Sequence, residues 1–350
     1  MNRKEKTLKI GRSYNGISLD FDTDNLHEVE IPIKDGYGEV MFLGDLHIGH
    51  NNFSRNHLER YIAVLKANPH IRIILMGDYF EAGEFGSDYM IEDQTKRLGK
   101  QIEEFLSLFK PVANQIIAML YGNHEERLIR DRRTHDIIKA VCGEDKDILM
   151  IIAERLGNTK IITGKPQLGL VLCLKVNGQT YPVFVHHSST GAITNQMTQV
   201  KRTSFNWALP LLAHGHVHRK GWQDHTYFTV TEINGKLYRQ VVRQYWMLTG
   251  CFLREPAYAE AKSYPIPDIG APIVRFYSDI DEMDYIDTRT QKEYRKFFRK
   301  AGGTIYRVPI DMSWWKKSIE KQTCENIPPM NNKESENKKI ENLPPEEEYK

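Results

Sequence analysis

The sequence of 350 residues contains only four cysteines, and no two of them form a CxxC pair. Cys142, Cys173, Cys251 and Cys324 are far apart, which argues against a disulfide framework or a zinc finger and is typical of a reducing compartment. Long apolar runs are also missing, since no stretch approaches the ~20 residues that a membrane-spanning helix requires. The opening residues, MNRKEKTLKIGRS, are basic but lead into no apolar segment, so we expect no signal peptide. We therefore predict a soluble, cytoplasmic protein without a membrane partner.

The net charge of the sequence is also small. The formal charge is +2 at pH 7, so the field of the whole molecule does not favour an anionic partner, and any basic surface has to be local. The hydrophobic content of 40% and the charged content of 27% are ordinary for a globular protein. The length allows one large domain or two ordinary ones. The oligomeric state is left open by the sequence.

The first half of the chain alternates between apolar strands and amphipathic helices. Three apolar segments that each end in glycine predict buried strands: EVMFLG, IRIILMG and QIIAMLYG. Between them, NHLERYIAVLKAN and TKRLGKQIEEFLSLFK place apolar residues at helical spacing, and Pro111 ends the second pattern. This alternation indicates parallel strands with right-handed helical crossovers.

The second half of the chain changes to antiparallel patterns. Asn177-Gly178 and Asn234-Gly235 each join two apolar segments, which is a strong β-hairpin signal. We expect an extension over residues 1–37 that packs on the core, a main domain over 38–255 and an accessory segment over 256–315. Residues 316–350 are rich in Lys, Glu, Asn and Pro and have little apolar periodicity, so we predict a disordered tail.

Metal-ligating residues follow each of the three early strands. Asp45 and His47 follow the first, Asp78 the second, and Asn123 and His124 the third. Because the carboxyl ends of parallel strands meet at one edge of a sheet, these side chains are expected to lie close together. The second half adds further histidines after apolar segments, in VFVHHSS and AHGHVHR.

Each of these residues has an ordinary explanation when it is taken alone. An aspartate after a strand is usually a turn residue or a helix cap, and GNHE by itself is typical of a glycine turn followed by a helix start. Together, however, carboxylate, amide and imidazole groups form a set that suits Mn, Fe or Zn. The number of ligands is sufficient for two divalent ions, of which Mn is our first choice.

The ordered blocks D-x-H, G-D, G-N-H-E, a histidine after a strand, and G-H-x-H resemble the calcineurin-like metallophosphoesterase superfamily. The resemblance covers roughly residues 38 to 220. It implies an α/β fold, a four-layer α/β/β/α sandwich of two mixed sheets, with a dinuclear metal site at the carboxyl edge of the strands. It also implies hydrolysis of a phosphoester by a hydroxide that bridges the two ions.

The resemblance assigns seven ligands to the two ions: Asp45, His47 and His218 to the first, Asn123, His186 and His216 to the second, and Asp78 to both. Similar motifs with two adjacent histidines use the first of them, which favours His186. Strand alternation does not decide between His186 and His187, because neighbours point to opposite faces. His187, His214 and His50 are left as residues that either contact substrate or are solvated.

Two further residues receive catalytic roles from the resemblance. His124 would face the substrate and protonate the leaving oxygen, work that suits an imidazole. Glu81 occupies the position where the protein-phosphatase branch has an acid that orients this histidine; the alternative is a surface glutamate. Arg127 lies just downstream of His124 and, with His187, is a candidate for substrate binding.

The motifs favour one branch of the superfamily over another. The Ser/Thr phosphatase branch has an arginine where this chain has Ala82, and it lacks the GHVH block. GDLHIGH is more similar to the DNA-repair exonuclease branch, so we predict a phosphodiesterase that acts on nucleic acid. KRTSFNW adds basic and aromatic residues that suit backbone contacts and base stacking. A phosphomonoesterase, a small-molecule or nucleotide phosphodiesterase, and a non-catalytic binding protein on the same fold remain alternatives.

Overall fold

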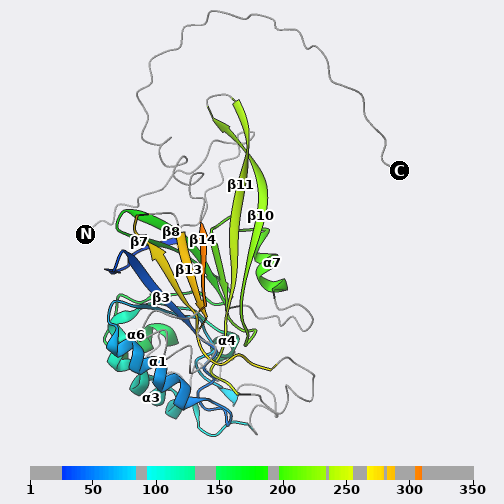
Figure 1. Cartoon of the computed structure of the whole chain (residues 1–350). Coiled ribbons are helices and arrows are strands. Elements are labelled where there is room, and N and C mark those ends of the chain that lie inside the picture. Colours follow the sequence, from blue (N-terminus) through cyan, green and yellow to red (C-terminus); the bar gives the residue numbers. More distant parts are fainter. Residues whose placement is uncertain are drawn as a thin grey trace, which may run out of the picture. The chain divides into compact units, whose positions relative to one another are not determined.

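The computed structural model describes residues 26–83, 93–130, 147–187, 197–233, 236–254, 266–279, 282–287 and 304–309 (Figure 1). The chain divides into two units, Met1–Asp311 and Met312–Lys350, and all of these residues belong to the first. Among them, no helix has the length and the apolar character that crossing a membrane requires.

The first sheet contains the strands of the predicted parallel half. Its strands are β2 (Ile33–Lys34), β3 (Tyr37–Leu43), β4 (Arg72–Leu75), β5 (Ile116–Met119), β6 (Ile162–Thr163), β12 (Ile273–Tyr277), β13 (Glu282–Asp287) and β14 (Thr304–Pro309). They are ordered β14-β13-β12-β3-β4-β5-β6, with β2 paired to β3. Strands β3 to β6 are parallel and β12 to β14 are antiparallel. The predicted parallel βαβ units are therefore confirmed, within a mixed sheet.

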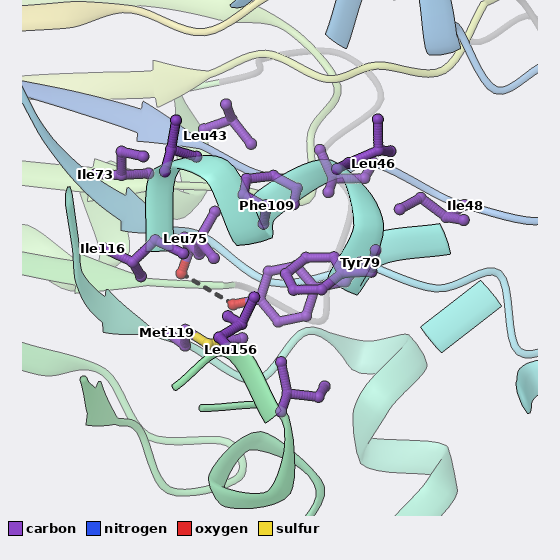
Figure 2. Packing of buried hydrophobic residues seen from close by; sticks show 14 of the residues in the cluster. Leu43, Leu46, Ile48, Ile73, Leu75, Tyr79, Phe109, Ile116, Met119 and Leu156 are labelled. Carbon is purple, nitrogen blue, oxygen red and sulfur yellow. Dashed lines mark hydrogen bonds between the residues drawn. The ribbon is translucent and has the colours of Figure 1, made fainter. Parts of the chain in front are cut away.

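Helices cover the outer face of this sheet. They are α1 (Arg55–Ala67), α3 (Leu98–Phe109) and α6 (Ile148–Leu156). Their apolar side chains pack on alternate strand residues such as Met41, Leu43 and Ile73 in one buried cluster. Figure 2 shows Leu43 and Ile73 of this cluster together with Phe109 of α3 and Leu156 of α6. After α3 the chain continues as a 3-10 turn, η3 (Lys110–Gln115), with Pro111 near its start. Proline therefore ends the α-helix as predicted, because it supplies no N–H to continue it.

The second sheet contains both predicted hairpins. Its strands are β1 (Leu26–Glu30), β7 (Leu170–Val176), β8 (Gln179–His186), β9 (Leu211–His214), β10 (Lys220–Ile233) and β11 (Lys236–Thr249), in the order β1-β7-β8-β9-β11-β10. The pairs β7–β8 and β10–β11 are antiparallel. Asn177 and Gly178, between β7 and β8, both have positive φ, as this turn type requires.

The short helix α7 (Thr198–Ser204) covers the outer face of the second sheet, where Val200 packs with Phe184, Leu212 and Trp246. The inner faces of the two sheets meet each other: Tyr181 of β8 contacts Phe276 of β12, with ring centroids 5.1 Å apart. Helices, sheet, sheet and helix form four layers (Figure 1). The predicted α/β/β/α sandwich of two mixed sheets is confirmed.

The segments outside the predicted main domain supply strands to both sheets. The predicted extension over residues 1–37 contributes β1, which pairs with β7, and β2, which pairs with β3. The predicted accessory segment over 256–315 contributes β12 to β14, and β12 pairs directly with β3. The predicted tail over 316–350 lies outside the described residues. The domain boundaries themselves remain predictions.

A buried ion pair joins β12 to β3, and it provides a test of how far the sheet depends on β12. Arg275 Nε donates to Glu39 Oε1 at 2.7 Å across the strand pair, and His70 Nε2 lies 3.0 Å from Glu39 Oε2. Replacing Arg275 by Met removes one partner of a buried charge, which typically costs about 3–5 kcal/mol. We expect a loss of this size in the free energy of unfolding measured with urea.

The matched control is Lys100→Met, because Lys100 pairs with Glu103 on the exposed face of α3. Exposed pairs contribute about 0–1 kcal/mol. If Arg275→Met and Lys100→Met reduced the free energy of unfolding equally, the ion pair between β12 and β3 would not stabilise the sheet.

Candidate metal centre

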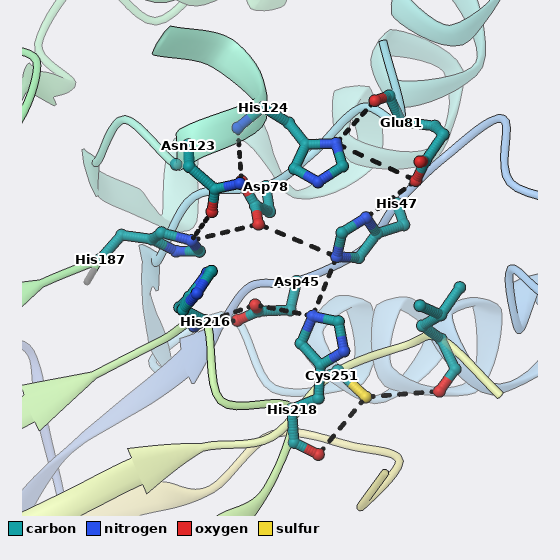
Figure 3. Close-up of polar contacts among 12 residues, drawn as sticks. Asp45, His47, Asp78, Glu81, Asn123, His124, His187, His216, His218 and Cys251 are labelled. Atoms are coloured by element: carbon teal, nitrogen blue, oxygen red, sulfur yellow. Dashed lines mark hydrogen bonds and ion pairs between the residues drawn. The ribbon is translucent and has the colours of Figure 1, made fainter. Parts of the chain in front are cut away.

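Polar side chains from both sheets meet at the carboxyl ends of five strands (Figure 3). From the first sheet, Asp45 and His47 follow β3, Asp78 follows β4, and Asn123 begins helix α4 (Asn123–Arg130) after β5. From the second sheet, His187 follows β8, and His216 and His218 lie between β9 and β10. The structure thus brings together six of the seven predicted ligands, all except His186.

One group of potential ligand atoms is formed by Asp45, His47, Asp78 and His218. One atom from each residue lies within 4.8 Å of all the others. His47 Nε2 and His218 Nε2 are 3.0 Å apart, and His218 Nε2 is 3.3 Å from Asp45 Oδ1. Four donors at this spacing, two nitrogen and two oxygen atoms, match a site for one divalent cation.

A second group is formed by Asp78, His187 and His216, again within 4.8 Å of one another. His187 Nε2 lies 3.1 Å from Asp78 Oδ2 and 3.2 Å from Asn123 Oδ1. Asp78 belongs to both groups. Its Oδ1 accepts from the main-chain N–H of His124 at 2.9 Å, which turns Oδ2 toward His187 and, at 3.8 Å, toward His47 Nε2. A carboxylate in this position can bridge two cations.

The chemistry of the donor set tests whether these residues fit an ion. One end of the Asn123 amide lies 3.1 Å from Asp78 Oδ2 and 2.8 Å from His216 Nδ1, so this side chain belongs to the same cluster. An amide offers an oxygen to a cation or an N–H group to acceptor atoms, depending on how it is turned. Together with the carboxylates and imidazoles of the two groups, the donor set fits two divalent ions.

The choice of His186 as the second-site ligand does not agree with this arrangement. His187 carries the ring that faces Asp78 and Asn123, and its Nδ1 lies 2.7 Å from the Met76 carbonyl oxygen, to which it can donate. His186, the last residue of β8, instead packs edge-on against His214, with centroids 5.3 Å apart. His214 is buried, and neither of its ring nitrogens has a hydrogen-bond partner among the described residues. Because strand neighbours point to opposite faces, only one of the two adjacent histidines can reach the centre.

The backbone is strained at the same positions. Of the non-glycine residues with positive φ in the described ranges, five are predicted ligands: Asp45, His47, Asp78, His216 and His218, with φ between 50° and 75°. Such conformations cost energy in L-residues and are concentrated at functional sites. The positive φ values do not depend on the side-chain distances, and they occur at residues of the same two ligand groups.

Glutamate and glycine residues hold the strained loops in place. Glu125 Oε1 accepts from the N–H groups of Tyr79 and Phe80, and Oε2 accepts from those of Asp78 and Gly122, at 2.8–3.1 Å. Gly122 is packed so tightly that an added Cβ would overlap the main-chain nitrogen and the carboxylate of Asp78. The GNHE block contains Glu125, but its role cannot be predicted from the sequence, since the acceptors of main-chain N–H groups are not visible in a motif.

The charges of the centre act strongly on one another. Burial opposes charge on Asp78 and His187, but their attraction prevails: it holds the pKa of Asp78 well below its usual range and raises the pKa of His187 to about 10. Burial, assisted by His124 and His218, lowers the pKa of His47 well below its usual range. Burial also lowers the pKa of His216 to about 4. A cation bound to His187 Nε2 would have to displace a proton.

His124 and Glu81 lie beside the first group. His124 Nδ1 donates to the main-chain carbonyl of Glu81 at 2.6 Å, while the Glu81 carboxylate is 4.0 Å from the same nitrogen. The carboxylate instead contacts His47 Nδ1 at 3.0 Å. Burial lowers the pKa of His124 to about 4 and raises that of Glu81 to about 8. Glu81 is therefore adjacent to His124 as predicted, but the contact comes from its backbone.

The remaining candidates lie at the rim or away from the centre. Arg127 on α4 places Nη2 3.2 Å from the outward-facing atom of the Asn123 amide. His50 is buried: its Nδ1 accepts from the N–H of Asn52 at 2.9 Å, and its Nε2 is 3.9 Å from Asp93. Neither residue belongs to the potential ligand groups found in the described part of the chain.

Comparisons with known proteins identify one family. A family model described as calcineurin-like phosphoesterase matches residues 38–224, more than half of the chain. No curated protein matches it.

Several solved structures are similar over most of the chain. Vacuolar protein sorting 29 from Cryptosporidium parvum is 12% identical with a TM-score of 0.36, and the match covers 78% of this chain and 98% of that one. The phosphoesterase Yfce from E. coli is 14% identical with a TM-score of 0.33, over 78% and 100%. Nuclease MPE from Pseudomonas putida is 12% identical with a TM-score of 0.26, over 67% and 83%. These likenesses are too weak to bear on activity or substrate.

The close packing at Gly122 leads to a prediction about metal binding. Gly122→Ala should displace Asp78 and abolish the binding of both ions, because the new methyl group would overlap the Asp78 main chain and carboxylate. The measurement is elemental analysis of protein dialysed against Mn²⁺. The control is Gly178→Ala: Gly178 has φ +85° in the β7–β8 turn, with no atom within 4 Å of an added Cβ. It should cost about 1 kcal/mol of stability and retain both ions. Full metal content in Gly122→Ala would contradict the assignment of Asp78.

Proposed function

Because the chain belongs to the calcineurin-like phosphoesterase family, whose members use divalent metal ions, we propose that it is a metal-dependent phosphodiesterase acting on nucleic acid. The observation that carries the proposal is the convergence of two ligand groups that share Asp78, at positions where the backbone is strained. A structural cluster of histidines has no need of such strain.

The proposed ligands divide between the two groups described above. Asp45, His47 and His218 would hold the first ion, Asn123, His187 and His216 would hold the second, and Asp78 would serve both. Mn²⁺ suits this mixture of carboxylate, amide and imidazole donors, and Fe or Zn would also fit. When bound, the ions would supply an acidified water as the nucleophile and would neutralise charge on the phosphate oxygens.

In this proposal, His124 acts on the leaving group. Its Nδ1 proton is committed to the Glu81 carbonyl, so the opposite nitrogen, Nε2, is the one available to a substrate. Burial keeps the ring neutral in the free protein, and the negative charge of a bound phosphoester favours its protonation. His124 can therefore protonate the leaving oxygen once the substrate is bound. Arg127 is positioned beside Asn123 to contact a phosphate oxygen.

A diester substrate is favoured by the residue at position 82. Ala82 occupies the position of the arginine in the Ser/Thr phosphatase branch, and its methyl group is buried. An exposed aromatic and basic surface lies at the end of α7, where Phe205 is 77% exposed and follows Lys201 and Arg202. Exposed aromatic side chains next to cations suit unpaired bases and their phosphates. We propose that a single-stranded nucleic acid contacts this surface.

The metal dependence has a direct test in two substitutions. Asp78→Ala should lose both ions and turnover together, because the shared oxygen disappears. His124→Ala should retain both ions and lose about 10²–10⁴-fold in rate on substrates with poor leaving groups. Metal content by elemental analysis and rates on aryl phosphodiesters provide the two readouts. Full activity of His124→Ala on a poor leaving group would exclude its role as an acid.

The substrate class is tested with the Mn²⁺-loaded protein on four substrates in parallel. These are linear duplex DNA, single-stranded DNA, a model diester and a model monoester. We expect hydrolysis of the diester and of single-stranded DNA. Raising the salt concentration should weaken binding of the polymer steeply and leave the small diester unaffected. Activity on the monoester alone would show a phosphomonoesterase instead, and no activity with both ions bound would show a binding protein.

A further inference from the structure

Glu81 makes two different contacts with two histidines of the site. Its carboxylate Oε2 lies 3.0 Å from His47 Nδ1, and its main-chain oxygen lies 2.6 Å from His124 Nδ1 (Figure 3). The carboxylate is 4.0 Å from His124, beyond hydrogen-bond length. At 3% exposure the side chain is sealed from water. A buried carboxylate requires a partner, and its only hydrogen-bond distance to either ring is to that of His47.

The main chain around Glu81 is held independently of its side chain. The N–H of Glu81 donates to the Ile48 carbonyl at 3.0 Å, and the N–H of Ile48 donates to the Tyr79 carbonyl at 2.9 Å. On the other side, the N–H of Ala82 donates to Gln101 Oε1 at 3.2 Å. The first two bonds tie the loop after β4 to the loop after β3, and the third ties it to α3. The direction of the Glu81 carbonyl, and with it the contact to His124, should survive a change of side chain.

The two nitrogens of His47 face opposite ways. Nε2 faces His218 and Asp78 in the first ligand group, and Nδ1 faces Glu81. A side-chain oxygen of Glu81 that accepts the Nδ1 proton fixes the ring and keeps the lone pair on Nε2, where a ligand requires it. Such partners of ligand histidines typically change metal affinity 10–100-fold when removed.

We propose that the carboxylate of Glu81 positions the metal ligand His47, while its peptide carbonyl positions the acid His124. This inference rests on the proposed function. It separates two tasks that the sequence resemblance assigns to one carboxylate. It also accounts for glutamate at this position: an aspartate, one methylene shorter, would leave His47 Nδ1 without its acceptor.

Three substitutions of Glu81 test the division by metal affinity, measured by calorimetry with Mn²⁺ on the whole chain. Glu81→Ala should weaken binding at one of the two sites about 10–100-fold and leave the other unchanged. Glu81→Asp should behave like Glu81→Ala, because its carboxylate falls short. Glu81→Gln should lose less Mn²⁺ affinity than the other two variants, because its amide oxygen can still accept a hydrogen bond from His47 Nδ1. Glu103→Ala, a glutamate on the exposed face of α3, is the matched control and should bind both ions as the wild type does.

The second readout separates the two histidines. With both sites saturated, the ratio of rates on aryl diesters with good and poor leaving groups should be unchanged in Glu81→Ala, because the carbonyl contact to His124 remains. His124→Ala should change that ratio and leave both metal affinities intact. An altered ratio in Glu81→Ala with unaltered affinities would show that the carboxylate serves His124 and would overturn the proposal. Unaltered affinities and ratio together would overturn it as well.

Failure of the proposed function is distinguishable from failure of this inference. If the wild-type chain binds no Mn²⁺, the metal centre itself is wrong. If the wild type binds two ions and Glu81→Ala binds them equally well, only the role of Glu81 is wrong. Circular dichroism of each variant shows whether the fold is retained, and Glu81→Gln, which preserves shape, provides the comparison if Glu81→Ala is unfolded.

Discussion

The carboxylate of Glu125 holds together the two loops on which the centre of the site depends. Its four hydrogen bonds reach the N–H groups at Asp78, Tyr79, Phe80 and Gly122, which belong to the ends of β4 and β5. Charge-assisted bonds of this kind are roughly twice as strong as neutral ones. They oppose the burial that, with the nearby charge of Asp78, raises the pKa of Glu125 to about 7. Without this acceptor, four main-chain donors would be buried and unpaired, and neither Asp78 nor Asn123 would have a defined position.

The strain in the ligand loops has to be balanced by interactions of the same size. A non-glycine residue held at positive φ costs on the order of 1–3 kcal/mol, and five proposed ligands share this conformation. The folded state of a domain is only about 5–15 kcal/mol more stable than the unfolded chain. Hydrogen bonds between the loops supply part of the balance: His216 N donates to both oxygens of Asp45, and His47 N donates to the Asp78 carbonyl. Without bound ions the backbone of the centre is thus locally destabilised, and cation binding is the interaction that would offset this strain.

The parts of the fold that follow from local pattern could be predicted from the sequence. Apolar runs ending in glycine located β3, β4 and β5, and Asn177-Gly178 located the β7–β8 hairpin. The pairing of β12 with β3 could not be foreseen, since the partner of a strand more than 200 positions away is chosen by packing and leaves no local signal.

At the site, residue types and strand ends were enough to select six of the seven proposed ligands. The choice between His186 and His187 depends on one step of strand alternation at a strand end, where the pattern no longer constrains the side chain. The contact of Glu81 with His124 uses a main-chain oxygen, which every residue possesses, so no motif can indicate it.

The two ligand groups draw on both sheets, and this makes the centre dependent on how the sheets are packed. The first group combines Asp45 and His47 of one sheet with His218 of the other. The second combines Asn123 with His187 and His216 in the same way, so each proposed ion joins the two sheets. Their separation is set by large side chains between them, such as Trp222 stacked on Tyr285 with centroids 4.7 Å apart. A change of a few tenths of an ångström in that packing alters every distance across the centre, because interiors are close-packed and transmit such shifts. The affinity for the proposed ions would therefore be a property of the whole sandwich, and their binding would stabilise the docking of the two sheets.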